Sequence, residues 1–64
     1  MITRENAGEK LLDYRRDNNI TQIEISKRAK ISIPTISGME SGSITPQTMT
    51  IHKLKAYFMS VGIQ

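Results

Sequence analysis

Hydrophobic residues recur at helical spacing along the chain, and short polar segments separate the groups. Ala7, Leu11 and Tyr14 follow one another at intervals of four and three residues, which places them on one helix face. Ile25 and Ala29 repeat that spacing further along. No segment of similar length alternates as a strand would. The pattern predicts an all-α fold, with helices over residues 6–17, 22–29, 33–40 and 46–59.

Residues that start and stop helices support these boundaries. Thr21, with Glu24 three residues later, predicts a capping box, in which each side chain bonds the backbone N–H of the other residue. Gly42 suits the left-handed position just beyond a helix. Pro46, with Thr45 before it as a cap, predicts the first position of the last helix.

The composition limits the class of protein. Sixty-four residues suffice for a single domain, residues 1–64, and the absence of cysteine excludes disulfides and thiolate zinc sites. No apolar run approaches the roughly 20 residues of a membrane span, and the first residues lack the pattern of a signal peptide. We therefore expect a cytoplasmic protein with no membrane partner, held together by its core or by a second subunit.

The sequence offers little for catalysis or metal binding. His52 is the single histidine, and no cysteine or nearby carboxylate accompanies it. A Gly-rich phosphate loop, a carboxylate pair and a nucleophile motif are all missing from the sequence. We expect no enzymatic activity, no cofactor, no metal and no small-molecule substrate.

Two short helices joined by a turn of three or four residues, followed by a polar loop and another helix, form the layout of a helix-turn-helix. The residues that carry a family resemblance are Leu11, Arg15, Ile20, Thr21, Gln22, Ile23, Glu24, Ile25, Ile31, Ser32, Thr35, Ile36, Ser37, Met39, Glu40, Gly42, Pro46, Thr50, Ile51, His52, Lys53 and Leu54. On these residues the chain resembles the phage-repressor and Cro-like, or XRE-type, helix-turn-helix family over roughly residues 8–58. The resemblance implies a lambda-repressor-like domain of four helices, with room for a fifth helix or a short strand at the C-terminus. Its motif would span residues 22–40 and bind double-stranded DNA.

The resemblance also implies a division of labour within the motif. The helix over residues 33–40 would enter the major groove, and the helix over 22–29 would lie across the DNA backbone, with Gln22 donating to a phosphate. Base contacts are expected from Ser32, Ile33, Pro34, Thr35, Ser37 and Gly38. Phosphate contacts are expected from Thr21, Gln22, Lys27, Arg28, Lys30, Ser41, Ser43 and Thr45.

Three features depart from the family pattern. Ser26 replaces the usual Ala, and Lys30 replaces the usual Gly of the turn, so either Lys30 is left-handed or the turn is remodelled. Residues 31–51 contain no Lys or Arg although the chain has a net charge of +3, which excludes pairing of an arginine with guanine from this helix. Phosphate attraction is then left to three cations per protomer, Lys27, Arg28 and Lys30. For a dimer, the logarithm of the DNA-binding constant should therefore fall with the logarithm of the salt concentration with a slope of roughly −5.

The resemblance pairs Arg15 with Glu40, which would tie the motif to the first helix. Because one short monomer contacts too little DNA for strong specificity, we expect a homodimer on a pseudo-palindromic operator and a repressor-type function. The apolar residues expected at the dimer contact are Tyr57, Phe58, Val61 and Ile63.

Two other functions stay open. The C-terminal residues resemble those of antitoxins, which bind a partner toxin and regulate their own genes through DNA. A helix without Lys or Arg would also suit a helical interaction module that has lost DNA binding.

Overall fold

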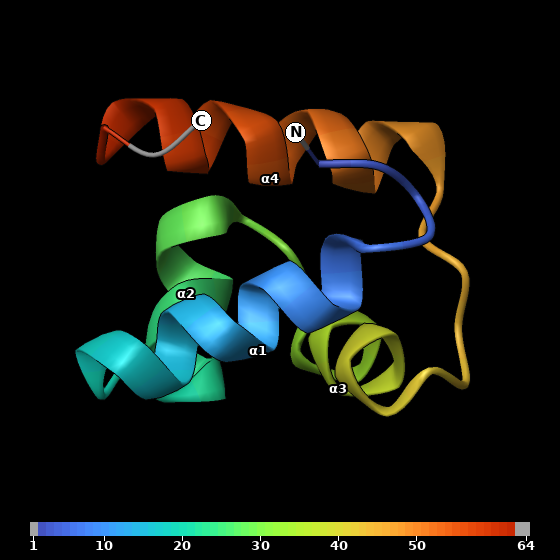
Figure 1. Ribbon diagram of the computed structural model, residues 1–64, viewed down its shortest axis with the longest axis horizontal. Coiled ribbons are helices and arrows are strands. Elements are labelled where there is room, and N and C mark those ends of the chain that lie inside the picture. Colours follow the sequence, from blue (N-terminus) through green and yellow to red (C-terminus); the bar gives the residue numbers. More distant parts are fainter. Residues whose placement is uncertain (1, 63–64) are drawn as a thin grey trace.

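The computed structural model describes residues 2–62, which form four helices and, within that range, no strand. Helix α1 spans Ala7–Asn18, α2 spans Gln22–Ala29, α3 spans Ile33–Ser41 and α4 spans Thr48–Ser60. Figure 1 shows α4 along one edge of the domain, α3 at the opposite edge and α1 across the middle. Helix α2 packs against α3 and α4, and α1 packs against α3. The predicted all-α class is confirmed.

The core takes one fully buried large side chain from each helix. These are Leu11, Ile25, Ile36 and Leu54. Burying a side chain of this size is worth about 1.5–3 kcal/mol, so the four together supply much of the attraction that holds the helices on one another. Helix α3 is anchored by Ile36 together with Met39, which is also buried.

The predicted capping box is present, but the predicted start of the last helix is wrong. The Thr21 hydroxyl accepts a hydrogen bond from the Glu24 backbone N–H at 3.1 Å, and the Glu24 carboxylate accepts one from the Thr21 N–H at 3.5 Å. Gln47 occupies the N-cap position of helix α4, and Pro46 lies buried in the loop before it. The Pro46 carbonyl accepts a hydrogen bond from Arg4 Nε at 3.2 Å, which ties this loop to the N-terminal segment.

An aromatic cluster joins α1 to the C-terminal half of α4. The hydroxyls of Tyr14 and Tyr57 lie 2.9 Å apart, and the Tyr14 ring meets the Phe58 ring edge-on with centroids 5.2 Å apart. Tyr57 and Phe58 are both buried. Their burial does not support the predicted dimer contact, because the monomer's own core covers them. Val61 is exposed, and Ile63 lies outside the described residues.

The turn between α2 and α3 closes without a glycine. Lys30 takes φ 59° and ψ 43°, which is left-handed, so the first of the two expected alternatives holds. The backbone N–H groups of Lys30 and Ile31 both donate to the Ser26 carbonyl. A side chain with a Cβ is strained in this conformation by roughly 1 kcal/mol.

Replacing Lys30 with glycine should therefore raise the free energy of unfolding by about 1 kcal/mol, because glycine adopts the left-handed region without a Cβ clash. Chemical denaturation of Lys30→Gly measures the gain. Lys30→Ala is the control, since alanine removes the charge and keeps the strain. An equal increase in the free energy of unfolding in both variants would show that the loss of the lysine charge causes the effect.

Within residues 2–62, no helix has the length and apolar character that crossing a membrane requires, and no three His, Cys, Asp or Glu side chains form a group that could hold a metal ion.

Candidate nucleic-acid interface

Helix α3 has a buried face and an uncharged outer face. Ile36 and Met39 point into the core and hold the helix on the domain. Exposed or half-buried residues form the outer face, namely Ser32, Ile33, Pro34, Thr35 and Ser37. Hydroxyl and apolar groups of this kind can contact base edges in a major groove, where both hydrogen-bonding groups and methyl groups are displayed.

Gly38 does not belong to the outer face. It is buried, and a Cβ added to it would overlap the side chain of Ile44. The structure does not support the predicted base contact of Gly38, because Ile44, from the loop after α3, covers it. Ile44 is itself 43% exposed and was missed by the sequence reasoning. The signal for it was an isolated large apolar residue in a polar loop.

Hydroxyl pairs lie at both ends of α3. At the N-terminal end, Ser32 Oγ donates to Thr35 Oγ1 at 2.8 Å, so the Thr35 hydroxyl keeps its own proton for another acceptor. At the C-terminal end, the Ser41 and Ser43 hydroxyl oxygens lie 3.0 Å apart. Both oxygens also lie within hydrogen-bond distance of the Gly38 carbonyl oxygen, Ser41 Oγ at 3.2 Å and Ser43 Oγ at 3.4 Å. These bonds fix the direction of side chains that border the outer face.

Glu40 joins three helices through its carboxylate. Arg15 donates through Nε to Oε2 and through Nη2 to Oε1, both at 2.7 Å, and Gln22 Nε2 donates to Oε1 at 2.9 Å. The side chains of Glu40 and Arg15 are only 6% and 16% exposed. Burial alone would raise the pKa of Glu40, but the hydrogen bonds from Arg15 and Gln22 outweigh it and leave the pKa below its ordinary value. The same bonds raise the pKa of Arg15.

Gln22 is placed differently from the prediction. Its side-chain amide donates to Glu40 and is half-buried, so it does not point outward as a phosphate donor. What α2 offers an anion at this end is the backbone of its first turn, where N–H groups have no intrahelical partner and the helix dipole is favourable. Thr21 is exposed at the same end and caps the helix.

The expected phosphate-binding cations lie toward the C-terminal end of α2, which Figure 1 shows beside α4. The nearby Tyr57 hydroxyl of α4 raises the pKa of Arg28, and Arg28 Nη2 lies 3.3 Å from a Glu24 carboxylate oxygen. Arg28 therefore lies on the α4 side of α2, which does not support its predicted phosphate contact. Lys27 and Lys30 are exposed.

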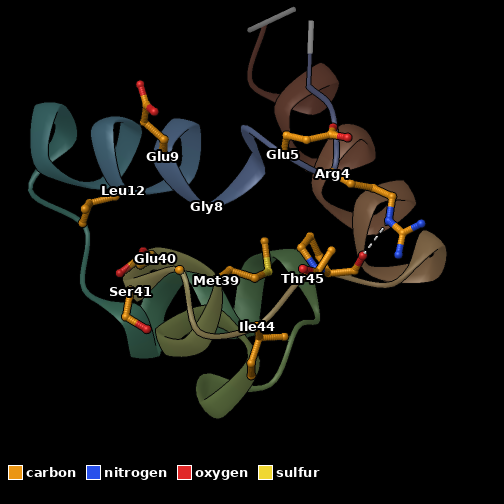
Figure 2. Close-up of a pocket in the computed structure, with 12 residues that line it drawn as sticks. Arg4, Glu5, Gly8, Glu9, Leu12, Met39, Glu40, Ser41, Ile44 and Thr45 are labelled. Atoms are coloured by element: carbon orange, nitrogen blue, oxygen red, sulfur yellow. Dashed lines mark hydrogen bonds between the residues drawn. The ribbon is translucent and has the colours of Figure 1, made fainter.

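A hollow of about 710 Å³ lies between the N-terminal half of α1 and the loop after α3 (Figure 2). Thr45, expected at a phosphate, is among its lining residues. The charged residues that line it are Arg4, Glu5, Glu9 and Glu40. Arg15 compensates the charge of Glu40, and the two remaining carboxylates against one guanidinium make this hollow a poor site for a phosphate. The outer face of α3 is the better candidate for contact with DNA.

A family model described as helix-turn-helix matches residues 11–58, well over half of the chain. The chain belongs to the XRE-type helix-turn-helix family. It is a DNA-binding transcriptional regulator of that family. A search of curated proteins and a search of solved structures returned no match.

The helix-turn-helix match includes both Arg15 and Glu40 and leaves out Gly8, a further residue that the sequence reasoning missed. Gly8 is buried in the first turn of α1, where a Cβ would overlap the Met39 carbonyl oxygen and come within 2.6 Å of its carbon. A glycine inside a predicted helix was the signal for such a close backbone approach. Gly8 lets α1 lie directly against the C-terminal end of α3.

Proposed function

We propose that this helix-turn-helix protein is a transcriptional repressor that binds its operator as a homodimer, with α3 in the major groove. One observation carries the proposal. The outer face of α3 is exposed and uncharged, while Ile36 and Met39 in the core and the Glu40 ion pair hold the helix from behind. A helix fixed in this way can present side chains to base edges at low cost in conformational entropy. We further expect the protein to act in the cytoplasm.

In this proposal the phosphate contacts flank α3. The N-terminal turn of α2, capped by Thr21, receives one phosphate, because helix N-termini favour anions. The exposed hydroxyl of Ser43, which does not line the acidic hollow, receives another. Lys27 and Lys30 supply the remaining attraction through their long, exposed side chains.

The size of the domain supports a dimer. Its extents are 25 × 21 × 18 Å, whereas one turn of DNA spans about 34 Å, so one copy covers a single half-site. With Tyr57 and Phe58 in the core, we assign the dimer contact to Met59 and Val61 at the end of α4. These two apolar side chains are 74% and 44% exposed.

Selection of bound sequences from a random DNA pool tests this function. The expected result is a motif of two inverted half-sites whose centres lie about 34 Å apart, one helical turn. A single half-site would contradict the dimer. An unenriched pool would contradict sequence-specific binding.

Ser37→Ala should weaken binding to the selected site more than binding to random DNA, by roughly 1–3 kcal/mol, because only base contacts discriminate between sequences. Titration of both DNAs by fluorescence anisotropy measures the difference. Lys27→Ala is the matched phosphate variant and should weaken both complexes alike. Equal losses for Ser37→Ala would show that its hydroxyl positions the protein and does not read a base.

The salt dependence should be shallow. Lys27 and Lys30 of two protomers neutralise up to four phosphates, and at about −0.9 per phosphate the slope of log K against log salt is about −4. This is less steep than the value of roughly −5 expected from sequence, because Arg28 is no longer included. Titrations at four salt concentrations measure it. A slope near −10 would place further bases, such as Lys53, Lys55 or Arg4, on phosphates.

A second candidate function is that of an antitoxin that also binds a partner protein. It is favoured by two exposed apolar residues of α4, Met49 and Met59. Figure 1 shows α4 at the edge of the domain opposite α3. A partner could cover α4 while α3 holds DNA. Co-expression with the product of the neighbouring gene, followed by purification through a tag on one chain, distinguishes this function. Separate elution of the two proteins would rule out that partner.

A further inference from the structure

Three apolar residues form a strip along the outer face of α3. Ile33 and Pro34 are exposed in its first turn, and Ile33 is 40% exposed. Ile44 lies over Gly38, which is one helical turn beyond Pro34 on the same side of the helix. Ile33, Pro34 and Ile44 are called the apolar strip below.

We propose that the apolar strip reads the 5-methyl groups of thymine, so that the operator half-site is rich in A·T pairs. This inference rests on the proposed function and adds the class of base that is read. Thymine is the one base that displays an apolar group in the major groove. An isoleucine side chain exposed to water is unfavourable, whereas contact with a methyl group removes its apolar surface from water.

The rest of this surface has no side chain that could recognise guanine instead of thymine. Residues 31–51 contain no Lys or Arg, so no side chain there can donate bidentate hydrogen bonds to guanine O6 and N7. The polar groups on the outer face are the hydroxyls of Ser32, Thr35 and Ser37. A hydroxyl can donate or accept and therefore bonds to several bases, so the methyl contacts decide the preference for A·T pairs.

Ile44 is held ready for such a contact before DNA binds. The backbone N–H groups of Ser43 and Ile44 both donate to the Gly38 carbonyl, at 2.9 Å and 3.1 Å. Figure 2 shows that the Ile44 side chain points away from α1. Because this packing fixes the side chain, contact with a methyl group costs little further entropy.

Parallel selections from two random DNA pools test the proposal, one made with thymine and one with uracil in its place. Uracil lacks only the 5-methyl group and keeps every hydrogen-bonding group. The thymine pool should return an A·T-rich motif, and the protein should bind the uracil version of that motif at least tenfold more weakly. This loss corresponds to about fourfold for each of two or more methyl contacts in the dimer. Equal affinity for both versions would overturn the methyl contact and leave the proposed function standing, whereas no enrichment in either pool would overturn both.

Variants of the strip locate the effect. Ile33→Ala should reduce the ratio between the affinities for the thymine and uracil versions several-fold, because one of the side chains that sense the methyl groups is gone. Met49→Ala removes another exposed apolar side chain, on α4, and should keep the full ratio. Melting curves confirm that both variants fold. A ratio in Ile33→Ala as large as in the unaltered protein would overturn the role of the strip.

Discussion

Replacing Gly8 with alanine should lower the free energy of unfolding by about 3 kcal/mol or more, and with it the affinity for DNA. Alanine normally stabilises a helix interior by about 1 kcal/mol relative to glycine, so the expected sign is opposite to the intrinsic propensity. The reason is that a Cβ at this position overlaps the backbone carbonyl of Met39 and comes within 3.3 Å of the Glu40 nitrogen. Backbone atoms at a helix end cannot rotate away as a flexible side chain could.

A small domain typically has only about 3–10 kcal/mol of stability, so this loss would leave Gly8→Ala largely unfolded at moderate temperature. Thermal melting followed by circular dichroism measures it. Lys10→Ala, two residues further along α1 at an exposed position, is the control and should melt within a few degrees of the unaltered protein. A Gly8→Ala variant as stable as this control would mean that α1 and α3 do not meet at Gly8.

The helices could be predicted from sequence because their signals are local. The capping box at Thr21 and the left-handed Gly42 lie within a few residues of the helix ends they determine. The start of α4 was misplaced by a tertiary contact, because Arg4 takes the Pro46 carbonyl from the other end of the chain. Lys30 shows the limit of residue preference, since tertiary packing imposes on it the conformation that glycine usually takes.

The site was predicted in outline but not in its details, because those depend on which element lies opposite each residue. Spacing alone cannot show that Ile44 covers Gly38, or that the hydroxyl of Tyr57 meets Tyr14 inside the domain. Helical periodicity predicts that Arg28 lies on the outside of α2, but it cannot show that Arg28 lies on the side toward α4. Each of these differences changes which side chains are available to a partner, at the surface expected to meet DNA or at the expected dimer contact.

The carboxylate of Glu40 links the fold to the interface. It lies in the last turn of α3 and accepts hydrogen bonds from Arg15 of α1 and Gln22 of α2. Arg15 Nη1 also donates to the Ile20 carbonyl at 2.9 Å, so the same guanidinium fixes the segment between α1 and α2. The orientation of α3 relative to the first turn of α2 therefore depends on one charge.

Glu40→Gln should lower the free energy of unfolding at pH 7 by about 3 kcal/mol, because it leaves the half-buried Arg15 guanidinium without its counter-charge. The lowered pKa of Glu40 sets the pH dependence of this difference. The unfolded chain, with an ordinary Glu pKa of 4.5, binds a proton more readily than the folded one. The stabilisation is therefore complete above pH 4.5 and is lost as the pH falls through the lower pKa of the folded state.

Urea denaturation from pH 7 to pH 2 should accordingly show a gap between the unaltered protein and Glu40→Gln that closes in acid, because protonated Glu40 resembles glutamine. Glu9→Gln removes an exposed carboxylate from α1 and should leave the curve of the unaltered protein nearly unchanged. A gap that persists undiminished at pH 2 would show that the shape of the Glu40 side chain stabilises the domain and its charge does not. In that case Arg15 would tolerate the loss of the carboxylate, and the position of α3 would depend on the core alone.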